Sequence, residues 1–270
     1  MAKIAAVQMA SGPHVQANLM EAARLIKEAA AQGAGMAVLP ENFAIMGYKE
    51  TDNVKVAEKP GNGPIQSFMS QCAKDNSIWI IAGTIPIQSA DPNKAYAASI
   101  MYNDKGEQVA RYDKRHLFDV EIAESSETYT ESDTIAAGEH LVVADTPFGK
   151  IGMAVCYDLR FPAYFRRMMA EGAQIFVLPS AFNDTTGKAH WEVLLRARAI
   201  ENLCYMIAPA QGGYHVNGRT TYGHSMVIDY WGNVREELGK GAGIILIDID
   251  LKAQSVTRKA FPVLEHRLDG

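Results

Sequence analysis

The sequence has few cysteines, and they lie far apart. Cys72, Cys156 and Cys204 are the only three in 270 residues, and neither a CxxC pair nor a cysteine–histidine cluster occurs. An odd and widely spaced set of this kind favours neither a disulfide framework nor a zinc site. We therefore expect reduced thiols, no metal and a cytoplasmic location.

The sequence also lacks an excess of positive charge and long apolar runs. Its formal net charge is −5, whereas nucleic-acid binding requires a basic patch. No apolar stretch approaches the roughly 18–20 residues of a membrane-spanning helix. In MAKIAAVQMASG, residues 1–12, Gln8 interrupts an apolar run that has only a strand's length. We interpret it as a core strand rather than a signal peptide, and expect neither nucleic acid nor membrane as a partner.

What is present is the pattern of an α/β protein. Hydrophobic residues make up 48% and charged residues 21%, which are ordinary globular values. Strand-like and helix-like segments alternate without a low-complexity linker, so we expect one domain over residues 1–270. The clearest predictions are a helix over 17–34, short strands over 3–9 and 36–40, a strand over 77–87, and a hairpin over 95–114 that turns at NDKGE.

An internal repeat organises the two halves. KIAAVQM (3–9) resembles KIGMAVC (150–156), and QGAGMAVLPENF (32–43) resembles EGAQIFVLPSAF (171–182). Each copy reads as strand, helix, Gly-Ala turn and a strand ended by proline. A βαβ unit forms a parallel pair whose strands end on one edge of the sheet, and ligands bind at that edge. Two such units predict two packed sheets with outer helices.

Three residues of this edge suggest nucleophilic catalysis. Cys156 comes at the last step of its predicted strand, just before a helix that begins at Pro162, and such surroundings activate a thiol. Glu41 follows the VLP strand of the first copy, and Lys114 stands where a charged run meets the apolar HLF. The alternatives are a core cysteine, a surface glutamate and a solvated lysine. For Cys72 and Cys204, core packing is the better interpretation.

A Glu–Lys–Cys set has a coherent division of labour. The carboxylate takes the thiol proton as the sulfur attacks a carbonyl or nitrile carbon, then returns it to the leaving amine. The ammonium stabilises the oxyanion together with a backbone N–H after the cysteine. Water then hydrolyses the thioester. This scheme needs no cofactor and no histidine.

LPENF (39–43), YDKRHLFD (112–119) and VCYDLRFP (155–162) resemble the three signature motifs of the nitrilase, or carbon–nitrogen hydrolase, superfamily. The similarity extends over nearly the whole chain, especially in 179–205 and 220–234. It implies a four-layer αββα sandwich of two mixed sheets with outer helices, whose monomers pair back to back as a homodimer. It also implies that Glu41 is the base, Lys114 the oxyanion stabiliser and Cys156 the nucleophile.

The resemblance further implies a second glutamate, after the lysine, that holds Lys114 and orients the leaving amine. Glu131 in YTESDTIAAGEH matches best, and Glu124 and Glu127 are the alternatives. A solvated acidic loop is the competing interpretation of this segment.

CYDLRFP and GKAHWE resemble the Nit branch, which contains deaminated glutathione amidases and omega-amidases. Such amide substrates carry free carboxylates, and Arg160 is a candidate partner because its planar fork pairs with a carboxylate. A structural pair with Asp158, or with the neighbourhood of Glu41, is the alternative. We expect the pocket to be lined by Tyr157, Arg160, Phe182, Asn183, Thr185 and Thr186, and expect Asp184 to cap the following helix. Arg219 and His215 are candidates for a distal carboxylate or for a solvated hairpin.

The resemblance thus implies a thiol-dependent amidase, with deaminated glutathione as the first candidate substrate. An omega-amidase acting on alpha-ketoglutaramate-type substrates is the second hypothesis. Nitrile or N-carbamoyl hydrolysis would use the same three residues. A scaffold protein that merely retains the fold is the non-enzymatic alternative.

Overall fold

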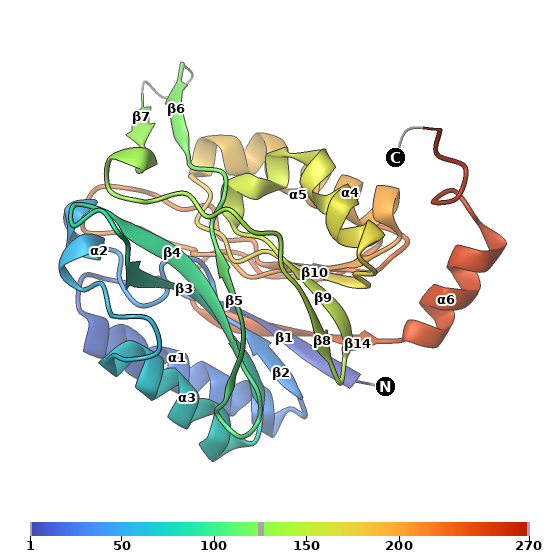
Figure 1. The fold of residues 1–270 in the computed structure, drawn as a ribbon, viewed down its shortest axis with the longest axis horizontal. Helices are drawn as coiled ribbons and strands as arrows, with labels where there is room; N and C mark the ends of the chain where they lie inside the picture. The colour runs from blue at the N-terminus through green and yellow to red at the C-terminus, as the bar shows by residue number, and fades with distance from the viewer. Residues whose placement is uncertain (1, 124–126, 269–270) are drawn as a thin grey trace.

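The computed structural model describes residues 2–123 and 127–268. Two six-stranded mixed sheets pack face to face, and helices cover their outer faces (Figure 1). In the first sheet the strand order is β14-β1-β2-β3-β4-β5. The central strands β1, β2 and β3 are parallel, and β14, β4 and β5 run antiparallel to their neighbours. The strand bounds are β1 Ala2–Gln8, β2 Met36–Val38, β3 Trp79–Gln88, β4 Ala95–Tyr102, β5 Gln108–Asp113 and β14 Gly243–Ile249.

The second sheet repeats this pattern of directions. Its order is β13-β12-β11-β10-β9-β8. Strands β9, β10 and β11 are parallel, and β8, β12 and β13 are antiparallel additions. The predicted pair of facing βαβ units is therefore confirmed. The strand bounds are β8 Val143–Thr146, β9 Gly149–Met153, β10 Ile175–Val177, β11 Tyr205–Ala208, β12 Met226–Ile228 and β13 Val234–Glu237.

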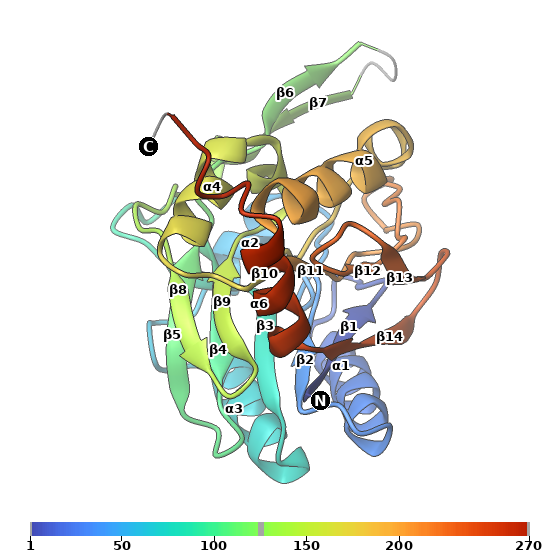
Figure 2. The same cartoon turned by 90° about the vertical axis from the view of Figure 1, so that its right-hand side faces the viewer.

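Helices connect the parallel strands and cover the sandwich. Helix α1 links β1 to β2, and α3 with the short α2 links β2 to β3; α4 and α5 make the matching connections in the second sheet. Helix α6 follows β14 and lies beside the second sheet (Figure 2). The helix bounds are α1 Val15–Ala31, α2 Thr51–Lys55, α3 Pro64–Asn76, α4 Pro162–Ala170, α5 Asp184–Asn202 and α6 Leu251–Ala260.

The core follows the two-residue period of the strands. In β1, Ile4 and Ala6 pack in a cluster with side chains of the second sheet, whereas Ala5 and Val7 pack with α1 and α3. Alternate side chains of a strand point to opposite faces, so an apolar run of this kind is buried on both sides. The αββα sandwich expected from the sequence is confirmed.

The predicted helix and strand segments formed, with local differences at their ends. The helix expected over 17–34 begins at Val15 and ends at Ala31. Helix α5 begins at Asp184, but its cap is Asn183, whose Oδ1 accepts a hydrogen bond from the Thr186 backbone N–H at 2.8 Å. The prediction that Asp184 caps this helix was therefore wrong: Asp184 lies one residue inside it and forms ion pairs with Lys188 and Lys240.

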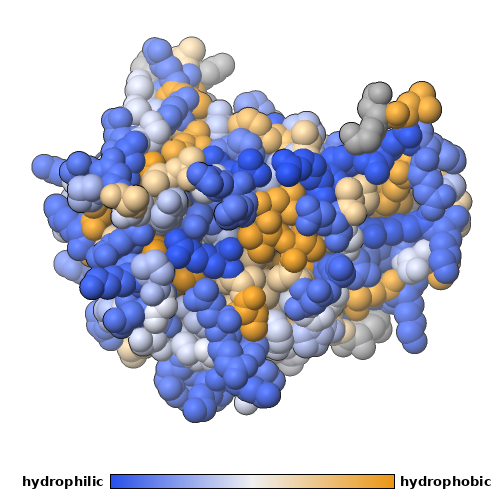
Figure 3. All heavy atoms as spheres, viewed as in Figure 1, coloured by the Kyte–Doolittle hydropathy of each residue, from blue (hydrophilic) through white to orange (hydrophobic). Residues whose placement is uncertain are grey.

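A two-stranded hairpin, β6 (Asp119–Ile122) and β7 (Glu127–Thr130), projects from the sandwich (Figures 1 and 2). It follows β5 and precedes a 3₁₀ turn, η1, at Glu131–Asp133. Glu124, one alternative for the second catalytic glutamate, lies outside the described residues. The face seen in Figure 3 is mostly hydrophilic, with apolar residues gathered near its centre. Among the described helices, none has the length and apolar character needed to cross a bilayer.

Candidate active site

A pocket opens at the carboxyl ends of the parallel strands of both sheets. Glu41 follows β2, Cys156 follows β9 and Ala181 follows β10, so both copies of the repeat contribute to one site. The hairpin strand β7 forms another part of the wall. The empty space is about 840 Å³ up to the open mouth, within the range of small-molecule sites.

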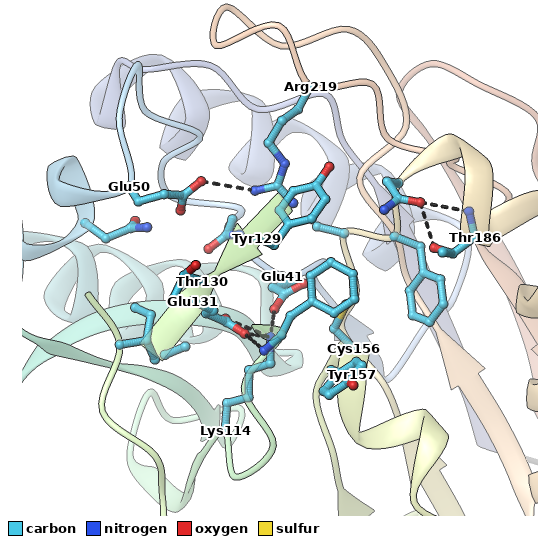
Figure 4. Close-up of a pocket in the computed structure, with 18 of the residues that line it drawn as sticks. Glu41, Glu50, Lys114, Tyr129, Thr130, Glu131, Cys156, Tyr157, Thr186 and Arg219 are labelled. Atoms are coloured by element: carbon cyan, nitrogen blue, oxygen red, sulfur yellow. Dashed lines mark hydrogen bonds and ion pairs between the residues drawn. The ribbon is translucent and has the colours of Figure 1, made fainter. Parts of the chain in front are cut away.

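Lys114 is the centre of the buried charges. It follows β5, its side chain is only 2% exposed, and its Nζ lies 2.8 Å from Glu41 Oε1 and 2.8 Å from both carboxylate oxygens of Glu131. Both carboxylates converge on this ammonium in Figure 4. Burial by itself lowers the pKa of Lys114, but the charges of Glu131 and Glu41 outweigh it and hold that pKa well above its ordinary value. Lys114 is therefore a permanent cation.

Glu131 begins the η1 turn after the hairpin, and it is the acidic residue of this segment that contacts Lys114. Its Oε2 also accepts a hydrogen bond from the Phe118 backbone N–H at 2.7 Å. Burial and the charge of Glu41 raise the pKa of Glu131, against the opposing effect of Lys114. Glu127 lines a separate hollow instead. The buried cluster thus holds two carboxylates around one ammonium.

The Glu41 backbone is held in place by close contacts with β3. A Cβ built on Gly83 would lie 1.9 Å from the Pro40 carbonyl oxygen, so only glycine leaves room for this approach. The next residue, Asn42, has φ +56° and donates its N–H to Thr84 Oγ1 at 2.8 Å. Non-glycine residues rarely adopt positive φ, and here it turns the chain sharply after the catalytic candidate. Glu41 itself is buried and directed at Lys114.

Cys156 lies outside its strand. The sequence placed it at the last strand position, but β9 ends at Met153, and Cys156 is the first residue of a 3₁₀ turn, η2, over Cys156–Arg160. Its φ is +47°, a strained conformation of the kind that concentrates at active sites. The Cys156 N–H donates to the Pro179 carbonyl at 2.9 Å, which anchors the strained residue to the end of β10.

The Cys156 thiol is protonated at rest. Burial and the nearby charge of Glu41 raise its pKa well above the ordinary value, and Lys114 and a backbone N–H of Ala181 oppose this only in part. A thiolate is the reactive form, so the proton must leave as the sulfur attacks. Glu41 is the carboxylate near enough to accept it, because it also acts as a hydrogen-bond acceptor for the thiol.

A second buried network holds the turn that carries Cys156. Asp158 is fully buried, and its carboxylate accepts hydrogen bonds from the Tyr112 hydroxyl at 2.6 Å and the Val155 N–H at 2.8 Å. It also contacts His116 Nδ1 at 2.6 Å. Tyr112 is in β5 of the first sheet, so this network joins the Lys114 segment to the Cys156 turn. Sequence reasoning missed it, although the YDKRH and CYDLR motifs contain all of its side chains.

The predicted substrate-binding residues divide into two groups. Tyr157, Arg160, Phe182, Asn183 and Thr186 all line the pocket beside Cys156. Thr185 instead lines a separate hollow with Glu127 and Asp184. Successive helix residues point about 100° apart, so adjacent threonines at the start of α5 cannot both face the pocket.

Asn183 presents an unused donor to the pocket. Its Oδ1 is taken by Thr186, as described above, but its Nδ2 is buried without a hydrogen-bond partner. Tyr129 of β7 lies beside it: burial raises the pKa of the Tyr129 hydroxyl, and the Asn183 side chain acts on that hydroxyl in the opposite direction. A buried donor without a partner is costly, and a substrate acceptor would satisfy it.

The arginine and histidine candidates have different surroundings. Arg160 lies over the rings of Tyr157 and Phe182, and its Nη1 is 3.2 Å from His190 Nδ1. It forms no ion pair with Asp158, whose carboxylate has the partners named above. His215 is buried against Ser11 and Thr221, and burial lowers its pKa. Both ring nitrogens of His215 have partners, and His215 does not line the pocket. We therefore assign it a structural role and not the binding of a distal carboxylate.

Several pocket residues carried no signal in the sequence. Most of them belong to loops and to the hairpin, whose approach to the strand ends depends on long-range packing rather than on local pattern. They are Asn42, Glu50, Asn53, Ala97, Phe118, Thr128, Tyr129, Thr130, Ile135 and Ala181. Arg219, a sequence candidate for a distal carboxylate, also lines the pocket.

The other two cysteines fit the packing interpretation. Cys72 and Cys204 are buried and free, and burial raises their pKa values to about 11 and about 12. Within residues 2–123 and 127–268, no three His, Cys, Asp or Glu side chains are grouped as metal ligands would be. The pocket brings together a thiol, two buried carboxylates and an ammonium.

The carbon–nitrogen hydrolase family model matches residues 3–259. The chain belongs to the carbon–nitrogen hydrolase family. It is 40% identical to the deaminated glutathione amidase of Yersinia enterocolitica over 98% of this chain and 92% of that protein. Saccharomyces cerevisiae Nit3, a member of branch 10 of the nitrilase superfamily, superposes with a TM-score of 0.89 at 32% identity, covering 99% of this chain and 97% of that one.

An amidase from Nesterenkonia sp. AN1 is a more distant carbon–nitrogen hydrolase-like structure. It has a TM-score of 0.81 at 25% identity and covers 97% of this chain and 98% of that one. A variant of that amidase carries acrylamide added to its active-site cysteine. The present chain, as a member of the carbon–nitrogen hydrolase family, is a thiol-dependent amidase, a hydrolase of non-peptide carbon–nitrogen bonds.

Proposed function

We propose that this carbon–nitrogen hydrolase cleaves the amide bond of deaminated glutathione through a thioester on Cys156. The observation that carries the proposal is the arrangement of two carboxylates, Glu41 and Glu131, around the Lys114 ammonium, in the same pocket as the strained cysteine. The name of the Yersinia relative supports the substrate. The residue roles below are part of the proposal.

Acylation begins with the Cys156 sulfur attacking the amide carbon while its proton passes to Glu41. The Lys114 ammonium and the Tyr157 backbone N–H stabilise the oxyanion; the first N–H groups of a helical turn have no acceptor within it. Glu41 then gives the proton to the leaving nitrogen, and the C–N bond breaks. Glu131 holds Lys114 and lies on the side of the departing amine.

Deacylation reverses the roles. Water enters as the amine leaves, Glu41 takes a proton from it, and the hydroxyl attacks the thioester carbon. The C–S bond breaks, the acid product forms, and the proton returns from Glu41 to the sulfur. Each cycle consumes one water and releases one amine and one carboxylic acid, without a cofactor or metal.

The pocket chemistry supports a substrate with free carboxylates. Arg160 and Arg219 both line it, and an arginine fork pairs well with a carboxylate. Deaminated glutathione carries one carboxylate on its keto-acyl part and one at the end of its dipeptide part. An alpha-ketoglutaramate-type substrate carries only the first.

The deciding experiment compares kcat/KM for deaminated glutathione and alpha-ketoglutaramate with one preparation. We expect deaminated glutathione to be preferred. A reversed preference would make the enzyme an omega-amidase, and turnover of only nitrile or N-carbamoyl compounds would reject the amidase assignment. No turnover of any of these compounds, with equal iodoacetamide labelling of all three cysteines, would favour the scaffold alternative.

We also propose that residues 1–270 act as one domain in a cytoplasmic homodimer. Exposed apolar side chains on helix α5, Val193 at 68% and Ile200 at 47% exposure, support a partner on its outer face. Light scattering of the purified protein would measure the mass; a monomer at micromolar concentration would reject the homodimer.

A further inference from the structure

Two arginine side chains line the pocket, and no buried carboxylate among residues 2–123 and 127–268 balances them. Arg160 has His190 and aromatic rings as neighbours, as described above. Arg219 has a long contact, 3.5 Å from its Nη1 to Glu50 Oε1, and the Glu50 side chain is 54% exposed. The Arg219 Nε is buried without a hydrogen-bond partner. Both guanidinium groups therefore keep donor capacity for a ligand.

The two buried carboxylates of the pocket do not balance the arginines. Glu41 and Glu131 are both committed to Lys114 at 2.8 Å. The charge of Lys114 in turn is balanced by these two buried carboxylates, so a substrate carboxylate gains less from it than from an arginine without a buried counter-charge. A substrate carboxylate that enters the pocket would find its free cationic partners at the two arginines, not at the lysine.

The two arginines mark different sides of the reacting bond. The Arg219 guanidinium lies 5.2 Å from the ring centroid of Tyr129, which stands two residues before Glu131. Figure 4 shows Arg219 and Tyr129 on the same side of the pocket as Glu131, with Glu50 to the left of the arginine. Arg160 instead lies over Tyr157 and Phe182, on the wall that follows Cys156 and β10. Arg219 thus lies on the side of the pocket that holds Glu131, whereas Arg160 lies on the side formed by the η2 turn that carries Cys156.

We propose that Arg219 forms the subsite for the carboxylate of the leaving group, the free C-terminal carboxylate of the dipeptide that departs. Arg160 then serves the carboxylate of the acyl part, which stays on the enzyme as the thioester. This inference rests on the proposed function. It assigns leaving-group selectivity to one side chain: an amide whose leaving group carries a carboxylate gains contacts that ammonia or an uncharged amine cannot make.

The test uses two forms of one substrate, deaminated glutathione and the same molecule with its C-terminal carboxylate converted to a carboxamide. For the unmodified enzyme we expect kcat/KM to be roughly 10- to 100-fold higher for the free carboxylate, the size of a lost hydrogen bond to a charged group. We expect the difference to lie mainly in KM. In Arg219→Gln this ratio falls close to one, and in Arg219→Lys it is intermediate, because lysine keeps the charge but not the fork.

Two control variants separate this from a general loss of activity. Arg160→Gln should lower kcat/KM for both forms by a similar factor and so preserve the ratio. Arg24→Gln, on the exposed face of α1, should change neither value. Thermal unfolding of each variant shows whether the fold persists.

The outcomes distinguish this inference from the proposed function. If the unmodified enzyme hydrolyses neither form, the proposed function fails and the inference with it. If it hydrolyses both forms equally, or if Arg219→Gln keeps the ratio of the unmodified enzyme, the leaving-group subsite is refuted while the amidase function stands. A ratio that falls in Arg160→Gln and not in Arg219→Gln would exchange the two assignments and overturn the proposal.

Discussion

At the same step of the internal repeat, Met9 keeps a strand-like pairing with the segment after β11, whereas Cys156 has left its strand. Strand β1 runs to Gln8, and Met9 continues it with a bridge to Gln211. Strand β9 ends at Met153, and the chain reaches Cys156 in a left-handed conformation. Two similar heptapeptides therefore give a packing residue in one half and a reactive thiol that lines the pocket in the other.

The halves also divide the chemistry. The first sheet and its following loops supply Glu41, Lys114 and Glu131, whereas the second supplies the thiol. The buried charges and the strained residue thus arise on opposite sheets and meet only when the sandwich closes. Variants on each side can test this division of labour.

The largest expected effect comes from removing the contribution of the second half. Cys156→Ala should abolish amine release while the fold persists, because no other group in the pocket can form the thioester. Amine release and circular dichroism measure the two properties. Cys72→Ala, in helix α3 away from the pocket, is the matched control and should keep its activity. Substantial turnover by Cys156→Ala would rule out the thioester mechanism.

Removing the contribution of the first half should also be severe. Lys114→Ala takes away the cation that stabilises the oxyanion, and we expect kcat to fall by at least ~10²-fold. It also leaves Glu41 and Glu131 buried without their shared partner, so Tm should fall as well. Steady-state kinetics and thermal unfolding would be compared with those of Cys156→Ala. A variant that keeps more than a tenth of the activity would show that the oxyanion is stabilised elsewhere.

Removing a single oxygen atom should weaken the Asp158 network that links the two halves. Tyr112→Phe removes the hydroxyl that donates to Asp158, and burial and Asp158 hold the pKa of Tyr112 well above its usual range, so this donor keeps its proton. Loss of a hydrogen bond to a buried charged group should cost about 1.5–3 kcal/mol of unfolding free energy. Urea unfolding measures this. Tyr96→Phe, on β4, is a control in which no comparable loss is expected.

The left-handed turn can be tested by comparing two inactive variants. Glycine usually destabilises a protein relative to alanine, but at φ +47° an alanine carries a steric penalty that glycine lacks. Cys156→Gly should therefore be more stable than Cys156→Ala, by about 1–2 kcal/mol. If the alanine variant is the more stable one, the strained conformation of Cys156 is not present in solution.

The smallest expected effect is a pH dependence of stability. The pKa of Cys156 is raised in the folded state, so the folded protein keeps a proton that the unfolded chain loses above about pH 8.5. This contribution is complete below that pH and is lost as the pH rises through the folded pKa. The Tm of the unmodified protein should fall faster above pH 8.5 than that of Cys156→Ala. Parallel Tm curves over this range would contradict the prediction.

Local patterns predicted the frame of the site, and long-range packing determined the rest. The repeat and the proline-ended strands placed Glu41 and Cys156 at one edge, because strand direction follows from βαβ connections. The hairpin wall and the side-chain network of Asp158 depend on contacts between segments distant in sequence, which no periodicity encodes. Thr185 shows how far a helix can be predicted from sequence. Its neighbour Thr186 faces the pocket, and an error of one residue in the predicted start of the helix is enough to assign the pocket position to the wrong threonine.

The two sheets differ in how their edges are completed. Strand β8 immediately precedes its partner β9, whereas β1 pairs with β14, so that Ala2 lies opposite Ile249. During synthesis the second sheet gains its edge locally, but the first must wait until residues 243–249 have emerged from the ribosome. Until then β1 presents an open edge of the kind that invites pairing with other chains. The nascent protein therefore spends most of its translation with the glutamate-bearing sheet unfinished, and chaperone dependence should be greatest for chains stalled before residue 243.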